Sequence, residues 1–212
     1  MDRDWVAWHQ AYDRPGSDLS RRLEVVRAQL AAALDRCPPG PIRLLSLCAG
    51  DGRDVLPVLA SHPRAADVSA VLVETDEVLA GRARAAVASL PDGAGTVDMR
   101  TADAGAVDVW ADGVPAQVVL ACGVFGNLAP DQVRQCVSTL PVACAPEGVL
   151  MWTRGRGAED PGPDLDRWLC TAGFEPVARV APERARYRVG VDTYVGPRRQ
   201  PVPGERLFTG FR

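Results

Sequence analysis

The spacing of apolar positions divides the chain into an N-terminal helical arm and a longer core. Leucine and valine recur every three or four residues over 17–36, Ser17 stands where it can cap the start, and Cys-Pro-Pro-Gly over 37–40 ends the pattern. This spacing predicts an amphipathic helix over 17–36. A shorter helix is expected before it, ending at the Arg-Pro-Gly break over 14–16 and carrying the side chains of Trp5, Trp8, His9 and Tyr12.

Beyond residue 41, short apolar runs alternate with helical stretches. Strands are predicted over 42–47, 70–73, 97–101, 117–121 and 148–153, and helices over 54–60, 77–90, 131–140 and 164–172. Near-continuous apolar strands with helical crossovers are typical of a parallel sheet covered on both faces. The last two segments, 174–180 and 187–195, alternate like a hairpin. The sequence therefore predicts a doubly wound α/β fold, with a mostly parallel seven-stranded sheet, an antiparallel C-terminal hairpin and an N-terminal helical arm.

Length and composition favour one folded domain. The 212 residues are divided here into a helical cap over 1–40, a core over 41–195 and a tail over 196–212. Hydrophobic residues make up 47% and charged residues 24%, which excludes disorder on compositional grounds. No apolar stretch reaches the roughly 20 residues of a membrane span, and the start of the chain has no apolar signal core. We therefore expect a cytoplasmic protein without a membrane partner.

Charge and cysteine content narrow the chemistry. All 24 basic residues are arginines, which excludes a lysine Schiff base and a phosphate loop of the GxxxxGK[ST] type. The net charge is −3 and no basic cluster stands out, so we expect a small-molecule substrate and no nucleic acid. Six cysteines without a CxxC pair and only two histidines give no zinc-ligand spacing, and no metal site is expected. The thiols in apolar runs suit buried, reduced cysteine.

The turn after the first core strand is the strongest candidate for a binding site. The chain reads Leu-Cys-Ala-Gly-Asp-Gly-Arg-Asp over 47–54, so a buried strand enters a tight turn and then a helix. Open α/β sheets bind ligands at the carboxyl ends of their strands, and glycines such as Gly50 and Gly52 let a cofactor approach the backbone. The turn indicates a nucleotide-like cofactor, although the same glycines could serve packing alone.

Two acids at later strand ends fit a nucleoside. Glu74 follows an apolar run over 71–73 and lies 22 residues after Gly52, a spacing at which a carboxylate can accept both ribose hydroxyls. Asp103 follows the next predicted strand and could accept the exocyclic amine of adenine. For both, the alternative is a solvated acid at a strand end.

The turn departs from the dinucleotide fingerprint. The pattern G-x-G-x-x-G needs a third glycine where Val55 stands, and Asp51 and Asp54 flank the place for a pyrophosphate. Carboxylates close to a diphosphate repel it unless screened, whereas a cofactor with sulfonium and ammonium groups tolerates them better. A nicotinamide-dependent oxidoreductase is therefore kept only as an alternative.

Over about 42–195 the motifs resemble those of the class I S-adenosylmethionine-dependent methyltransferases, in particular small bacterial members. The resemblance implies S-adenosylmethionine as cofactor and S-adenosylhomocysteine as product. It also implies the contacts with the cofactor: Cys48, Ala49, Gly50 and Gly52 at the methionine part, Glu74 and Thr75 at the ribose, Asp103 and Ala104 at the adenine, and Ala121, Cys122 and Gly123 beside the methyl group. The family usually has an acid where Ser46 stands and a glycine where Cys48 stands. A domain that binds the cofactor without methylating is therefore a second alternative.

Four residues are candidates for the chemistry of methyl transfer, which needs alignment and desolvation, and a base only when the acceptor loses a proton. His9 and Tyr12 share a helical face and, by the resemblance, could close over the cofactor or simply anchor the arm. Asn127 could orient a nucleophile or cap a short turn. Arg154 is expected on the rim of the site, where a guanidinium suits a substrate carboxylate or phosphate. The expected function is methyl transfer to O, N or C of a small metabolite by a monomer or homodimer.

Overall fold

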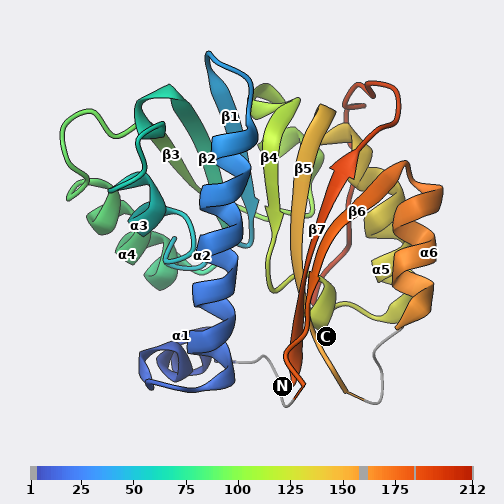
Figure 1. Cartoon of the computed structure of the whole chain (residues 1–212), viewed down its shortest axis with the longest axis horizontal. Coiled ribbons are helices and arrows are strands. Elements are labelled where there is room, and N and C mark those ends of the chain that lie inside the picture. Colours follow the sequence, from blue (N-terminus) through green and yellow to red (C-terminus); the bar gives the residue numbers. More distant parts are fainter. Residues whose placement is uncertain (1–3, 158–161, 184, 212) are drawn as a thin grey trace.

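A seven-stranded sheet runs through the computed structural model, which describes residues 4–157, 162–183 and 185–211 (Figure 1). The strand order is β3-β2-β1-β4-β5-β7-β6. Strands β1 to β5 are parallel, and β7 pairs antiparallel with both β5 and β6. The predicted α/β fold with its C-terminal hairpin is thereby confirmed. The strands are β1 (Ile42–Leu47), β2 (Val68–Glu74), β3 (Thr96–Thr101), β4 (Ala116–Ala121), β5 (Cys144–Gly155), β6 (Phe174–Val180) and β7 (Tyr187–Tyr194).

The helices follow the predicted pattern with two exceptions, one of which is that the helix predicted over 77–90 ends at Val87. The hydroxyl of Ser17 accepts a hydrogen bond from the Ser20 amide at 3.0 Å, which caps α2 as expected. The helix predicted over 54–60 is wrong at its start, because the left-handed backbone of Gly52 (φ +73°) keeps the chain in turns up to Val55. The helices are α1 (Trp5–His9), α2 (Asp18–Arg36), α3 (Leu56–Leu59), α4 (Glu77–Val87), α5 (Pro130–Thr139) and α6 (Pro163–Thr171), and a 3-10 helix η1 (Gln10–Asp13) extends α1.

Helices cover both faces of the sheet, so the central strands are buried on both sides. Leu30 and Leu34 of α2 pack with Leu44 on the face that lies in front in Figure 1. Leu45, its neighbour along β1, points to the opposite face and packs in the cluster that contains Trp152 beneath α5 and α6. Burial on both faces explains why these strands read as continuous apolar runs in the sequence.

The tail that follows β7 is part of the packed structure. Arg199 donates a hydrogen bond to the carbonyl of Ser138 in α5, at 2.9 Å, and the amide of Leu207 donates one to the carbonyl of Gly105 at 2.8 Å. Leu207 and Phe208 are buried in the same core as Trp152. The last residues therefore return to the carboxyl end of the parallel strands, where the candidate site lies.

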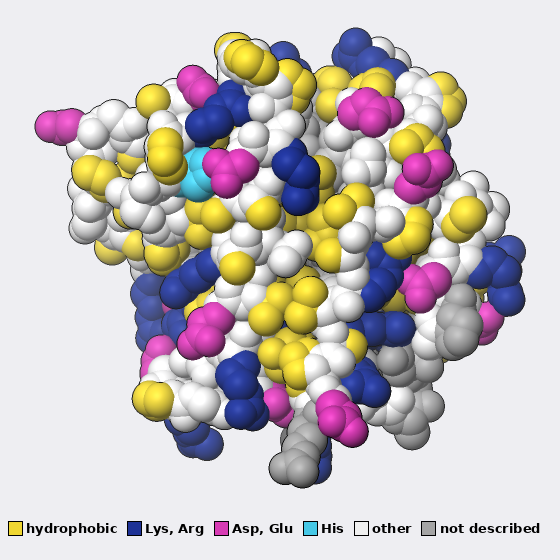
Figure 2. Space-filling model, viewed as in Figure 1, with side chains coloured by type: hydrophobic (Ala, Val, Ile, Leu, Met, Phe, Trp, Pro, Cys, Tyr) yellow, Lys and Arg dark blue, Asp and Glu magenta, His cyan; other side chains and the backbone are white. Residues whose placement is uncertain are grey.

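The surface carries arginines and carboxylates interspersed with each other on the face drawn in Figure 2, with hydrophobic side chains gathered near its centre. Across the described ranges no helix combines the length and the apolar character that crossing a membrane would require.

Candidate functional site

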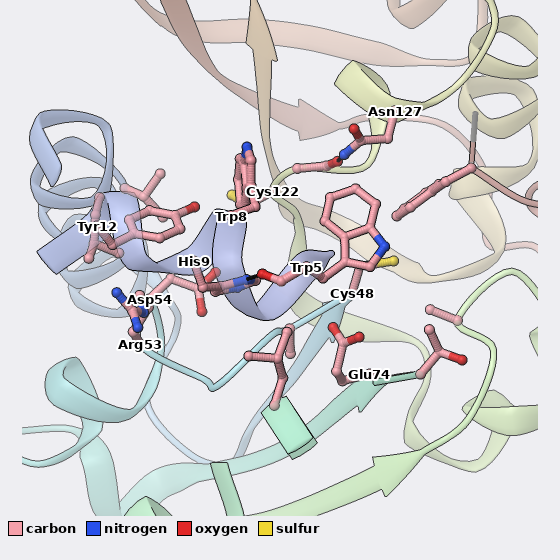
Figure 3. Close-up of a pocket in the computed structure, with 18 of the residues that line it drawn as sticks. Trp5, Trp8, His9, Tyr12, Cys48, Arg53, Asp54, Glu74, Cys122 and Asn127 are labelled. Carbon is pink, nitrogen blue, oxygen red and sulfur yellow. Dashed lines mark hydrogen bonds between the residues drawn. The ribbon is translucent and has the colours of Figure 1, made fainter. Parts of the chain in front are cut away.

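A cavity of about 380 Å³ lies at the carboxyl ends of β1, β2, β3 and β4, where an open α/β sheet binds ligands (Figure 3). This volume lies within the range of small-molecule sites. Its walls come from four parts of the chain: the arm, α2, the loops at the strand ends and the tail. Within the described residues, no group of three or more His, Cys, Asp or Glu side chains could hold a metal ion.

Most of the candidate residues from the sequence meet in this cavity. The following line it: His9, Tyr12, Cys48, Ala49, Glu74, Thr75, Asp103, Ala104, Cys122, Gly123 and Asn127. Four others do not form its lining: Gly50, Gly52, Ala121 and Arg154. The strand order therefore brings together residues between 48 and 127 that lie at or after the ends of four different strands, and the arm adds His9 and Tyr12.

The expectation that Arg154 lies on the rim of the site is wrong. Strand β5 continues to Gly155, so Arg154 is inside the sheet, with only 3% of its surface exposed. Its guanidinium donates a hydrogen bond to the carbonyl of Phe125. Arg154 thus holds the loop after β4 through this hydrogen bond and does not line the cavity.

The turn after β1 has left-handed backbone at three alternate residues. Cys48, Gly50 and Gly52 have φ angles of +53°, +59° and +73°, in the left-handed region that glycine adopts without strain. Cys48 stands where the resembled family usually has glycine, and its backbone has the conformation that glycine favours. The departure in sequence is therefore accommodated at a steric cost and leaves the path of the turn intact.

The carboxylate of Glu74 is held rigidly at the end of β2. One oxygen accepts a hydrogen bond from the Gly50 amide at 2.8 Å, and the other accepts one from the Asp76 amide at 2.9 Å. Glu74 is only 8% exposed, and it lines the cavity. Because each carboxylate oxygen has more than one lone pair, the group can still accept hydrogen bonds from a ligand.

Asp103 is fixed by two contacts, one of which the sequence does not reveal. Its Oδ1 accepts from the Gly105 amide at 2.8 Å, and its Oδ2 accepts from the guanidinium of Arg206 at 2.5 Å. Arg206 belongs to the tail, 103 residues further along the chain. The orientation of this carboxylate therefore depends on the docking of the tail.

The N-terminal arm closes directly on the glycine turn. A Cβ atom added to Gly50 would lie 2.5 Å from Nε2 of His9, so the imidazole rests against the glycine backbone. Nδ1 of His9 is 2.8 Å from the carbonyl of Trp5, and since a carbonyl can only accept, Nδ1 carries the proton and Nε2 the lone pair in the neutral ring. In Figure 3 the rings of Trp5 and Trp8 lie over the cavity from the same short helix. A side chain larger than hydrogen at position 50 would prevent this closure.

Arg22 is a buried cation that the sequence reading missed. Its residue surface is 9% exposed, its guanidinium donates a hydrogen bond to the hydroxyl of Tyr12, and it lies 5.8 Å from the centre of the Trp8 ring. No carboxylate among the described residues forms an ion pair with it. The available signal was its position on the apolar face of α2, one place before Leu23, where an arginine is unusual.

Asp54 is the second missed residue, and it lines the same end of the cavity. Its Oδ1 atom is buried, and it makes no hydrogen bond within the part of the chain that the structure describes. Burial raises the pKa of Asp54 to about 6, with a further contribution from Asp51, while Arg27 acts in the opposite direction. Asp54 raises and Arg22 lowers the pKa of the Cys122 thiol, and all three residues line the cavity, so it holds opposite charges.

No protein-family model matches the chain, and no curated protein matches it either. Solved structures do match in fold. The carbon methyltransferase CurJ aligns with a TM-score of 0.71 and 17% identity over 91% of this chain, which spans 59% of that structure. Magnesium protoporphyrin IX methyltransferase from Synechocystis PCC 6803, with bound SAM, aligns with a TM-score of 0.68 and 13% identity over 91% of each chain.

A third structure is the 1,6-didemethyltoxoflavin-N1-methyltransferase of Burkholderia thailandensis, solved with its substrate and S-adenosylhomocysteine. It aligns with a TM-score of 0.59 and 18% identity over 82% of this chain and 78% of that one. At these identities the likeness concerns the fold. The chain has the fold of the S-adenosylmethionine-dependent methyltransferases, which the resemblance in its motifs implied.

The strain at Cys48 leads to a first prediction. We expect Cys48→Val to lower the free energy of unfolding by about 1–2 kcal/mol, because a β-branched side chain fits the left-handed region poorly. Cys48→Gly should stay within about 1 kcal/mol of the parent, since relief of strain offsets the lost side chain. Cys37→Val, at an ordinary extended position (φ −60°), is the control. Calorimetric melting would contradict this account if the valine variant at position 48 melted above the glycine variant.

The buried carboxyl of Asp54 leads to a second prediction. Its pKa of about 6 in the folded protein exceeds the value near 3.9 of an unfolded chain, so ionisation costs stability as the pH rises through this window. Asp54→Asn removes that cost. The stability gained by the variant should therefore grow by about 1–2 kcal/mol between pH 4.5 and pH 7.5 and change little above that. Urea unfolding at both pH values measures it, with exposed Asp92→Asn as control; a gain independent of pH would refute it.

Proposed function

We propose that this protein is an S-adenosylmethionine-dependent methyltransferase that transfers a methyl group to oxygen, nitrogen or carbon of a small metabolite. One observation carries the proposal: on this fold, the glycine turn, Glu74 and Asp103 meet in a single cavity at the ends of β1, β2 and β3. Two of the similar structures hold SAM or S-adenosylhomocysteine, and the substrates in their names are a metalloporphyrin and a toxoflavin precursor. These facts belong to those proteins and support the same class of reaction here.

The cavity residues fit the groups of this cofactor. The carboxylate of Glu74 suits the two ribose hydroxyls. Because two backbone amides already hold this carboxylate in place, it does not have to reorganise when a ligand binds. At the other end, the carboxylate of the methionine part suits Arg22 and Tyr12, and its ammonium group suits Asp54. A zwitterionic amino-acid group would thus pair with buried charges that have no ion-pair partner among the described residues. Asp51 is neutralised by an ion pair with Arg53 at 2.5 Å, so the charge that argues against a diphosphate is that of Asp54, which lines the cavity.

When bound, S-adenosylmethionine supplies an electrophilic methyl group on a sulfonium. The chain's part is to hold the reactants close and to exclude water, which the aromatic side chains of the arm do by covering the cavity. Burial raises the pKa of the Cys48 and Cys122 thiols, so both stay protonated near neutral pH. Since the thiolate is the nucleophilic form of cysteine, the walls of the site do not compete with the acceptor.

The residues proposed for the chemistry of methyl transfer differ in whether they can contact an acceptor. Asn127 lines the cavity where it can contact an acceptor, and its amide nitrogen donates a hydrogen bond to the Gly123 carbonyl at 2.5 Å. His9 keeps its basic Nε2 against Gly50, so we assign it to closing the arm over the turn and not to proton removal. The buried place of Arg154 supports no direct contact with a substrate.

Ligand binding by the purified chain tests the function. Titration calorimetry should detect binding of S-adenosylmethionine and S-adenosylhomocysteine, but not of NADH, because of the acidic turn. Binding of NADH alone would overturn the proposal. With a methyl-labelled donor, release of label to added acceptors separates an enzyme from a protein that only binds the cofactor. Native mass spectrometry of freshly purified protein adds the identity of any ligand that it retains.

Arg22 provides a prediction about the cofactor's amino-acid part. We expect Arg22→Met to weaken binding of S-adenosylhomocysteine by about 10- to 100-fold, the range for losing a charge-assisted hydrogen bond. Binding of 5′-methylthioadenosine, which lacks that part, should change less than threefold. Arg21→Met, on the exposed side of the same helix, is the matched control. Equal losses for both ligands would mean that Arg22 only maintains the shape of the site.

A further inference from the structure

The tail is attached to the rim of the cavity by backbone pairing. The Leu207 amide donates to the Gly105 carbonyl at 2.8 Å, and the Val107 amide donates to the Glu205 carbonyl at 3.0 Å. A Cβ atom on Gly105 would lie only 2.5 Å from the carbonyl oxygen of Phe208, so the approach requires glycine there. The tail is therefore seated at a prepared place beside Asp103.

A second attachment holds the last described residues. The side chain of Gln132, in α5, donates to the hydroxyl of Thr209 at 2.7 Å and accepts from the Thr209 amide at 3.1 Å. Together with the pairing at Gly105, these bonds hold the segment on either side of Phe208. The backbone of this part of the tail has defined partners in the fold.

The tail presents aromatic rings to the cavity. Phe208 and Phe211 stack on each other with ring centres 5.5 Å apart, and both line the cavity beside Asp103 and Ala104. The ring of Trp5, from the arm, meets Phe211 edge-on at 5.7 Å. Segments from both ends of the described chain thus enclose one end of the cavity with apolar ring surfaces.

The same cavity is lined by a carboxylate that the tail contacts. Asp103 accepts the guanidinium of Arg206 at 2.5 Å, while its other oxygen is held by the Gly105 amide. Flat apolar surfaces beside a hydrogen-bond acceptor suit a planar heteroaromatic ring that carries an amino group. A purine base with an exocyclic amine has this chemistry.

We propose that the C-terminal tail forms the nucleobase part of the binding site, with Phe211 and Trp5 packing on the purine and Arg206 positioning the carboxylate of Asp103. The inference rests on the proposed function, which supplies the adenosine. It adds residues after β7, outside the core over 41–195, to the cofactor site. Phe211 contacts the base, whereas Arg206 acts through Asp103.

The ring at position 211 is tested with S-adenosylhomocysteine and the full chain. Phe211→Leu removes the ring and keeps an apolar side chain, and we expect its Kd to rise about tenfold, within the range for losing one stacking partner. Phe211→Tyr should bind within twofold of the parent. Val202→Ala, an exposed tail position away from the cavity, is the control. Binding by the leucine variant within twofold of the parent would overturn the proposal, as would equal losses for leucine and tyrosine.

Fluorescence gives a readout that does not depend on affinity. A purine against Trp5 should quench tryptophan emission at saturating S-adenosylhomocysteine, and the quench should be at least halved in Trp5→Phe, in which Trp8 is the remaining tryptophan of the lining. An unchanged quench in that variant would contradict the place of the base. If Phe211→Leu lowers the melting temperature of the free protein, the fluorescence measurement alone decides whether the purine lies against Trp5.

The positioning role of Arg206 has its own test. The parent should prefer S-adenosylhomocysteine over S-inosylhomocysteine, in which a carbonyl replaces the exocyclic amine. Arg206→Met should reduce this preference at least fivefold, because Asp103 loses its fixed direction. A purely structural role for Arg206 would weaken both ligands equally and would contradict the assignment. If the parent protein binds neither S-adenosylmethionine nor S-adenosylhomocysteine, the proposed function itself fails, which is a different result from any of these.

Discussion

The hydrogen bond from the Gly50 amide to the carboxylate of Glu74 joins the turn after β1 to the end of β2, and the site is organised around this contact. The turn that brings this amide to the neighbouring strand has left-handed backbone at Cys48 and Gly50. The same bend exposes the backbone of Gly50, against which His9 rests. One turn therefore fixes an acid on one side and seats the arm on the other.

The enclosure of the cavity comes from segments outside the parallel strands. The arm, α2 and the tail each contribute side chains to the walls, and the arm and tail meet through Trp5 and Phe211. The sheet provides a floor of hydrogen-bonded strand ends, and the arm, α2 and the tail form the cover. Such a division lets the floor keep its geometry while the cover differs among proteins of the same fold.

The elements of the core could be predicted because their signals are local. Parallel strands buried on both faces give continuous apolar runs, and Ser17 marks the start of α2 by its own side chain. The start of α3 could not be predicted from periodicity, since the backbone of Gly52 overrides the helical pattern that follows it. Arg154 was misplaced because the sequence does not show that β5 continues one residue beyond it.

The site was predictable where it consists of residues next to strand ends and not where it depends on distant contacts. Glu74 and Asp103 follow apolar runs, so their places could be inferred from order along the chain. Arg206 reaches Asp103 only because the tail returns to the ends of the parallel strands, and the spacing of residues in the sequence does not predict this contact. Arg22 carried a signal of its own, a charge within an apolar helix face, which is a general mark of a buried polar site.

The buried carboxyl of Asp54 couples the binding of a ligand in the cavity to the release of a proton. With a pKa of about 6, it holds a proton for part of the time in mildly acidic surroundings. A cation settling beside it favours the ionised form, so that proton leaves for the solvent. Uptake of a positively charged ligand is then coupled to acid release, and the heat observed depends on which buffer receives the proton.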